Sequence, residues 1–212
     1  MIGESHVDVF DTSGTVGSVI SWRPEGDRWS VTLVSGEDRI DAVGVDAFEA
    51  GFGEQVPDDA VAFNGDHGTR LHNVYPQLFN QCVHDAAARF QPKEAGPAVI
   101  WSRAGWSASQ RHPVGWVANP QSDWEGLAAS IRGGLSLGMS GNPYHGSAIG
   151  GFYGADQVDP ELYVRWLQAA VFASHMRLYG IGEREPWAFG PEAEAVARKW
   201  LAFRYRLIPY LE

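Results

Sequence analysis

The first 40 residues alternate short hydrophobic runs with turn-forming residues. The runs at 7–10, 16–22 and 29–34 are rich in β-branched and aromatic side chains, which favour β-strands. The turn-like segments 12–14 and 24–27 between them are too short for a crossover between parallel strands. This pattern predicts a small antiparallel β element over residues 1–40.

Beyond residue 40 the hydrophobic runs alternate with longer stretches of helical periodicity. Five runs are candidates for parallel strands, the last of them weaker than the others: 42–48, 98–101, 114–118, 135–139 and 176–181. Strands that alternate with helices are typical of an α/β fold. The spacing therefore predicts about five βα units over residues 41–212.

The first of the predicted helices covers residues 75–90. Its apolar residues recur at helical spacing, so one face is expected to be buried, and that face holds Leu78, Cys82, Val83, Ala86 and Phe90.

The other helices are indicated by the residues at their ends. Ser122 begins an S-x-x-E capping box. Asp159 and Pro160 form an N-cap followed by proline at the first helical position. Pro191 opens the last helix, and Pro209 is predicted to end or kink it.

Composition limits the partners and the location of the chain. The net charge is −10 and Lys and Arg are not clustered, which argues against nucleic acid or an anionic membrane, because both are bound through phosphate neutralisation. The sequence has no apolar run of about 18 residues and no signal-peptide pattern. Cys82 is the single cysteine, and we expect it to be a buried apolar residue in a reducing cytoplasm. Neither a metal site nor a cofactor is predicted.

Distinctive motifs follow the predicted strands, where reactive side chains lie in β/α barrels. Residues 50–54 read AGFGE, 101–105 WSRAG, 116–119 WVAN, 148–152 AIGGF and 174–178 SHMRL. In this order and spacing the motifs resemble the C-terminal half of the catalytic barrel of glycoside hydrolase family 31, in particular its α-xylosidases and α-glucosidases. The resemblance covers residues 41–212 and implies part of a (β/α)8 TIM-type barrel. We see no such resemblance in residues 1–40.

The resemblance also implies where the catalytic carboxylates should stand. Family 31 enzymes are retaining α-glycosidases, and retention needs two carboxylates about 5 Å apart. The family's nucleophile position is Gly51 here, its acid/base position is Asn119, and a third family aspartate is replaced by Ala148. None of these side chains exchanges a proton or attacks a sugar in the working pH range. We therefore expect no intact catalytic pair.

Other positions of the family's substrate site keep suitable side chains. The resemblance implies substrate contacts for Arg103, Trp116, His175, Trp101 and Phe52. A guanidinium suits hydroxyl groups, and indole rings offer apolar faces to a sugar. Structural alternatives stay open for three of them: Arg103 paired with a structural carboxylate, Trp101 in the core, and His175 satisfied within the fold.

Four further carboxylates lie near the two replaced positions. Glu49 points to the same side of its strand as Gly51 but lies deeper, and Asp46 points to the opposite side. Glu54 lies three residues beyond Gly51, and Asp123 belongs to the start of a capped helix. None of the four is expected to take over the chemistry.

The interpretation that follows is a catalytically impaired or dead α-glycosidase-like barrel fragment that binds α-glucosides or α-xylosides weakly at best. Two alternatives stay open: a functional retaining α-glycosidase, and a scaffold that binds no ligand. Whether the chain is an enzyme is thus undecided at this point. A barrel of eight strands needs three more than we predict here, and homo-oligomerisation is one way to cover the missing part.

Overall fold

The computed structural model describes residues 7–10, 16–25, 28–35, 38–40, 47–51, 53–90, 96–112, 114–116, 119–154 and 157–211. The chain divides into two compact units, Met1–His112 and Pro113–Glu212, called unit 1 and unit 2 below. Predictions that concern Asp46, Phe52, residues 117–118 and the side chain of Phe90 fall outside the described part.

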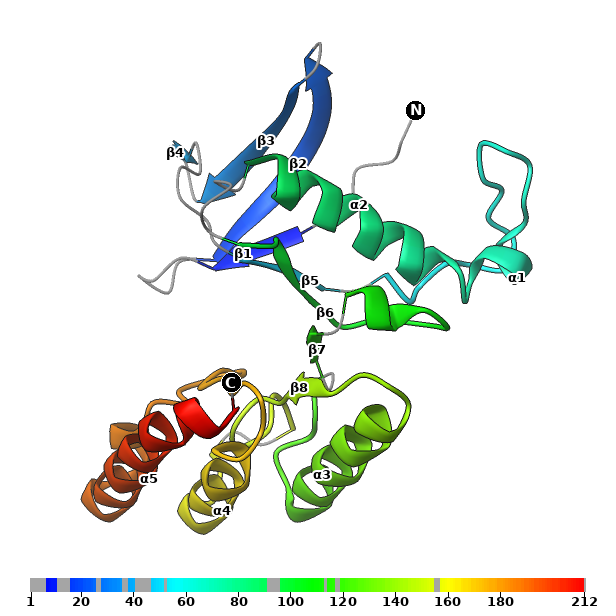
Figure 1. The fold of residues 1–212 in the computed structure, drawn as a ribbon. Helices are drawn as coiled ribbons and strands as arrows, with labels where there is room; N and C mark the ends of the chain where they lie inside the picture. Colours follow the sequence, from blue (N-terminus) through cyan, green and yellow to red (C-terminus); the bar gives the residue numbers. More distant parts are fainter. Residues whose placement is uncertain are drawn as a thin grey trace. The chain divides into compact units, whose positions relative to one another are not determined.

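Unit 1 begins with four antiparallel strands, drawn in blue in Figure 1. They pair in the order β1-β2-β3-β4, and each is antiparallel to the next. The strands are β1 (Val7–Phe10), β2 (Val16–Glu25), β3 (Arg28–Ser35) and β4 (Asp38–Ile40).

A parallel strand pair forms the second part of unit 1. β5 (Ala47–Ala50) pairs in parallel with β6 (Val99–Ser102). The connection between them contains α1 (Gly68–Leu71) and the longer α2 (Tyr75–Phe90). A helical crossover between parallel strands defines a βαβ unit, and here its core consists of Ala50, Val83, Ala87 and Ile100.

The buried face of α2 differs from the predicted one. Leu78 is 56% exposed and Cys82 is also exposed, so the expectation that both are buried was wrong. The buried positions are Pro76, Asn80, Val83 and Ala87, which follow each other at intervals of three and four residues. Of these, Val83 was predicted correctly. On this face Val83 and Ala87 pack in the core, and the Asn80 amide donates a hydrogen bond to a backbone carbonyl, a polar contact that a hydrophobic pattern does not reveal.

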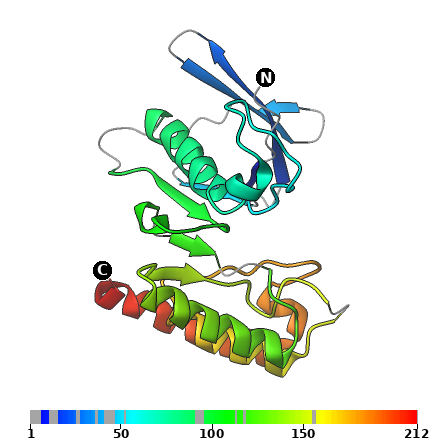
Figure 2. The same ribbon diagram turned by 90° about the vertical axis from the view of Figure 1, so that its right-hand side faces the viewer.

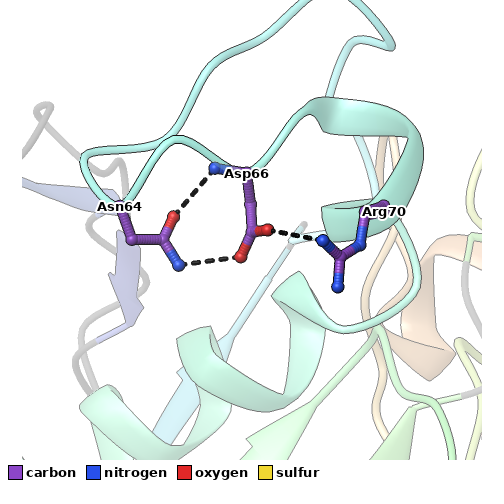
Figure 3. A network of polar contacts seen from close by, with 3 residues as sticks. All are labelled: Asn64, Asp66 and Arg70. Atoms are coloured by element: carbon purple, nitrogen blue, oxygen red, sulfur yellow. Dashed lines mark hydrogen bonds and ion pairs between the residues drawn. The ribbon is translucent and has the colours of Figure 1, made fainter.

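A small polar network holds the loop between β5 and α1 (Figure 3). Asn64 Nδ2 donates to Asp66 Oδ2 at 2.7 Å, and Asn64 Oδ1 accepts from the Asp66 backbone N–H at 3.1 Å. Arg70 Nη1 lies 3.1 Å from Asp66 Oδ1. Because the Arg70 side chain is largely exposed, this ion pair contributes no more than about 1 kcal/mol.

Unit 2 contains a second parallel pair with helices on one side. β7 (Val114–Trp116) pairs in parallel with β8 (Tyr144–Gly146). In Figures 1 and 2 the helices of this unit lie on one side of β8. They are α3 (Trp124–Met139), α4 (Pro160–Ala170) and α5 (Pro191–Leu211). With its parallel strand pairs and covering helices, the structure confirms the predicted α/β class.

The prediction of a strand at 135–139 was wrong, because α3 continues to Met139 and the strand is β8. The end of α3 explains the error. Gly141 has a φ of 87°, and the Asn142 N–H donates to the Leu137 carbonyl at 2.9 Å, which is the pattern of a glycine C-cap. The helix therefore ends at this glycine and passes through the earlier pair Gly133 and Gly134.

The N-cap of α3 is Asp123, one residue after the predicted one. Its carboxylate accepts a hydrogen bond from the Gly126 N–H at 2.7 Å. Ser122, the predicted cap, is buried instead. Asp123 is thus a capping residue, which agrees with its assignment to the helix rather than to catalysis.

The starts of α4 and α5 are as predicted. Asp159 caps α4 by accepting from the Glu161 N–H at 3.1 Å, and Pro160 is the first helical residue. α5 begins at Pro191 and continues past Pro209 to Leu211, so the helix does not end at this proline, and the alternative of a kink there stays a prediction. The predicted strand at 176–181 is reduced to one isolated parallel bridge, between Ala148 and Arg177.

Arg184 links three segments of unit 2 from a position that is only 4% exposed. Its Nε donates to the Gly151 carbonyl at 3.0 Å, and its Nη2 donates to Ser122 Oγ at 3.3 Å. Its own carbonyl accepts from the Tyr163 hydroxyl at 2.8 Å. Burial lowers the pKa of this guanidinium, which shows that its charge is costly to bury and that the hydrogen bonds must compensate.

Replacing Arg184 by methionine should lower the free energy of unfolding of unit 2 by about 3 kcal/mol, because a buried carbonyl and a hydroxyl lose their donors. Urea unfolding followed by circular dichroism measures this change. The control is Arg198→Met on α5, whose arginine is exposed and pairs with Glu194, and which should cost less than about 0.5 kcal/mol. Equal losses in both variants would contradict the assigned role of Arg184.

Candidate active site

In unit 1 the predicted site residues lie at the carboxyl ends of two neighbouring strands. Gly51 follows β5, and Trp101 in β6 is the register partner of Glu49. The Arg103 N–H, just past β6, donates to the Ala50 carbonyl at 3.2 Å. Gly51 and Arg103 are therefore held side by side by the parallel pairing.

Arg103 forms an ion pair with Glu54. Its Nη2 donates to Glu54 Oε1, and the Arg103 side chain is 15% exposed whereas that of Glu54 is 41% exposed. This contact is the structural alternative that the sequence left open for Arg103. A sugar hydroxyl at this guanidinium would have to compete with a carboxylate for its N–H groups.

Gly51 has room for a side chain. Among the described residues other than its chain neighbours, a Cβ atom built on it would meet no atom within 4 Å, and its backbone does not adopt a positive φ. Gly53 is different, since its φ is 95° and a Cβ there would lie 3.1 Å from the Phe79 ring. Packing and backbone conformation thus require glycine at position 53 but not at position 51.

In unit 2, Trp116 takes part in a stack of aromatic rings and a guanidinium. Trp116 is only 4% exposed. The Arg177 guanidinium carbon lies 4.7 Å from the Trp116 ring centroid and 4.2 Å from the Tyr179 ring centroid, distances typical of cation–π contacts. The Tyr179 ring also lies 5.2 Å from that of Phe152. This burial favours a packing role for Trp116, and its contact with substrate stays a prediction.

His175 is a largely buried, neutral imidazole. Its Nδ1 lies 3.0 Å from Ser174 Oγ, and that hydroxyl donates to the His145 carbonyl at 2.9 Å. Burial lowers the pKa of His175 to about 4, a hydrogen bond with the Gly115 backbone opposes this shift, and His145, Arg204 and Arg177 add to it. A neutral imidazole can both donate to and accept from a hydroxyl group.

The segment that carries His175 is fixed by Arg204 of α5. The Arg204 guanidinium donates to the carbonyls of Val171, at 2.8 Å, Ala173 and Ser174. Sequence reasoning missed Arg204, and it also missed Arg177. Arg204 contacts backbone carbonyls, and one of the two rings against Arg177 is the distant Trp116, so these contacts leave no motif in the sequence.

The two other replaced positions also lie in unit 2. Ala148 is fully buried, and its neighbour Ile149 donates its N–H to the Arg177 carbonyl at 2.9 Å. Asn119 is partly buried. The residue after it, Pro120, accepts from the Phe152 N–H at 2.7 Å, so the segments that carry Asn119 and the AIGGF motif are hydrogen-bonded to each other.

The model of the glycosyl hydrolases family 31 TIM-barrel domain matches residues 16–212. The chain belongs to glycosyl hydrolase family 31. Its parallel strand pairs are consistent with part of the (β/α) barrel of that family. The family match includes residues 16–40, which we had expected to show no resemblance, so the family's sequence pattern begins earlier than the motifs suggested. The domain boundary near residue 40 stays a prediction.

Relatives of this family 31 chain include enzymes of different specificity. It is 34% identical to an α-xylosidase of Emericella nidulans over 82% of its own length and 22% of the relative's. It is 29% identical to a sulfoquinovosidase of Escherichia coli over 85% of this chain and 27% of the relative. The chain therefore spans about a quarter of the length of these curated relatives.

Solved structures of family 31 enzymes are also similar to this chain. The cycloalternan-degrading enzyme from Trueperella pyogenes, in complex with a covalent intermediate, matches with a TM-score of 0.69 and 29% identity, over 79% of this chain and 24% of that one. A family 31 sulfoquinovosidase from E. rectale, in complex with an aza-sugar inhibitor, matches with a TM-score of 0.67 and 30% identity, over 79% and 26% of the two chains.

Two further features of the family 31 chain concern metals and membranes. Among the residues that the structure describes, no three His, Cys, Asp or Glu side chains gather into a group that could hold a metal ion. Within the same residues, none of the helices combines the length and apolar character needed to cross a membrane.

Proposed function

We propose that this chain is a catalytically impaired family 31 domain that binds α-glucosides or α-xylosides weakly at most. One observation carries the proposal: the positions that match the family's nucleophile and acid/base are Gly51 and Asn119. A retaining mechanism needs one carboxylate to attack the anomeric carbon and another to transfer a proton. Neither a hydrogen atom nor an amide side chain supplies these functions at neutral pH.

The contacts of the nearby carboxylates support the same proposal. Glu54 pairs with Arg103, which holds its charge on a guanidinium rather than leaving it available for attack. Asp123 caps α3. An active retaining α-glycosidase would need two carboxylates free to act on one sugar, and these two have structural partners.

A scaffold without ligand is the second candidate, favoured by specific contacts. The Arg103–Glu54 pair and the Arg177–Trp116 stack both engage side chains that the family uses at its sugar site. If these contacts persist in solution, the retained motifs serve packing alone. A binding experiment separates this candidate from weak glycan recognition.

We expect binding of glucose, xylose or maltose only at tens of millimolar or weaker. A millimolar affinity corresponds to about −4 kcal/mol, and each lost hydrogen bond to a charged group removes about 1.5–3 kcal/mol. Titration followed by tryptophan fluorescence measures this, in parallel with assays on aryl α-glucosides and α-xylosides, where no turnover above the blank is expected.

The variant Arg103→Ala should abolish any such binding. Its matched control is Arg132→Ala, because Arg132 is an exposed arginine of α3 that also pairs with a glutamate. Saturation below 1 mM that Arg103→Ala removes and Arg132→Ala keeps would overturn weak binding and support a lectin-like role. Absence of any response would favour the scaffold, and turnover that copurifies with the protein would refute the impaired-enzyme proposal.

A further inference from the structure

Polar contacts join α2 to the segment that follows β6, residues 104–112. Gln77 Nε2 donates to Ser109 Oγ at 2.7 Å. Asn80 Nδ2 donates to the Ala104 carbonyl at 2.9 Å from a buried position. Side chains on one side of α2 thus hold residues 104–112. One turn further along α2, a contact between two histidines joins the helix to the end of the same segment.

His84 of α2 and His112 at the end of the segment are in ring contact. Their centroids lie 4.8 Å apart with the planes inclined by 41°. His112 is only 7% exposed, and its Nδ1 is buried without a hydrogen-bond partner in the described part of the chain. A buried ring with an unpartnered nitrogen is favourable only while it carries no charge, because an unpaired buried charge is costly.

The charged groups around His112 make its protonation unfavourable. Burial is the largest cause that lowers the pKa of His112, and the neighbouring His84 lowers it further. Arg111, from the 3-10 turn Ser109–Arg111, acts in the same direction, and Asp85 of α2 opposes it. Asp85 does not cancel the effect, since the net direction is downward.

We propose that His84 and His112 form a proton-operated latch, which keeps residues 104–112 on α2 at neutral pH and releases them when His112 is protonated. The sign follows from linkage: a histidine whose pKa is lowered in the closed state favours the open state as the pH falls below about 6.5. The latch concerns the fold of unit 1 and does not depend on the proposed glycan binding.

The latch would act on the candidate site because the released segment begins directly after Arg103. Ala104 receives the Asn80 hydrogen bond, and the Arg103 N–H is bonded to the Ala50 carbonyl of β5. When residues 104–112 leave α2, one side of the Arg103 backbone loses its support. Protonation would thereby weaken the Arg103–Glu54 pair.

Hydrogen exchange measured by mass spectrometry on the full chain tests the proposal. Protection factors, which are corrected for the intrinsic effect of pH on exchange, are compared at pH 7.5 and pH 5.5 for peptides within 104–112. We expect protection to fall by up to about tenfold for each pH unit below 6.5. The reference is the same set of peptides in the variant His112→Phe, in which the titrating ring is absent.

Two variants and one control complete the test. His112→Phe keeps the ring without the charge, so protection should no longer change with pH. His84→Gln removes the second ring, so the fall in protection should shrink, and this variant serves if His112→Phe does not fold. His67→Phe, at an exposed histidine of unit 1, should behave like the unchanged chain. A pH response of the same size in the unchanged chain and in either latch variant would overturn the proposal.

Discussion

Acidification from pH 7 to pH 4 should lower the free energy of unfolding of unit 2 by about 3 kcal/mol through His175 alone. Burial lowers the pKa of this imidazole to about 4, whereas an unfolded histidine has a pKa of about 6.5. Between these values the unfolded chain binds more protons than the folded one, so stability is lost as the pH falls through this window. Residual solvent access to the ring makes this figure an upper value.

Urea unfolding at several pH values, followed by the far-ultraviolet circular dichroism of the helices, measures the change. His175→Gln keeps hydrogen-bonding groups without a titratable charge, so its stability should depend less on pH by up to the same amount. His67→Gln, at an exposed position of unit 1, should leave the profile unchanged. An identical pH profile for His175→Gln and the unchanged chain would show that another group is responsible. His145 is the first candidate, because burial also lowers its pKa.

Local chemistry made parts of the fold predictable from the sequence. The Asp159–Pro160 start of α4 and the Pro191 start of α5 are correct, because caps and prolines act on their own first turn. The strands that run into the AGFGE and WSRAG motifs, β5 and β6, also lie close to where the hydrophobic runs 42–48 and 98–101 placed them. Both strands could be located because residues that interrupt a strand stand at the ends of these hydrophobic runs.

Predictions failed where a distant contact outweighs the local pattern. The buried face of α2 contains the Asn80 amide, whose hydrogen-bond partner lies 24 residues away. The end of α3 is decided by Gly141 rather than by the earlier glycines. Neither effect appears in the spacing of hydrophobic residues, because both depend on backbone groups that only the folded chain brings together.

For the candidate site, too, the sequence predicted local features and missed distant contacts. The order of the motifs was enough to predict the family, which the family match to residues 16–212 supports. It did not reveal that Glu54 pairs with Arg103 or that Arg177 lies between two aromatic rings. Motif matching compares positions one at a time, whereas these pairings decide whether a retained side chain is available to a substrate.

Gly51→Asp should raise the rate of fluoride release from α-glucosyl fluoride by three orders of magnitude or more, in a burst of about one equivalent, while Asn119→Asp alone should give no release. A carboxylate at position 51 would supply the missing nucleophile, and a group of this kind is commonly worth such a factor. Fluoride leaves without receiving a proton, so the first step with this substrate does not need the acid at position 119. Hydrolysis of the resulting glycosyl-enzyme still lacks the base that this position would supply. The open space around Gly51 predicts that the aspartate is accommodated without loss of stability.

Comparing substrates then separates the two missing roles. With maltose, whose leaving group needs a proton, Gly51→Asp should remain at least about a hundredfold slower than the double variant Gly51→Asp with Asn119→Asp, since general acid catalysis contributes about 10²–10⁴ in rate. The matched control is Gly138→Asp, because a side chain at this α3 glycine would also meet no atom within 4 Å, and it should be inactive on both substrates. Turnover by Asn119→Asp alone would mean that another carboxylate attacks the sugar. A folded Gly51→Asp protein that leaves the fluoride intact would show that position 51 is not where the nucleophile belongs.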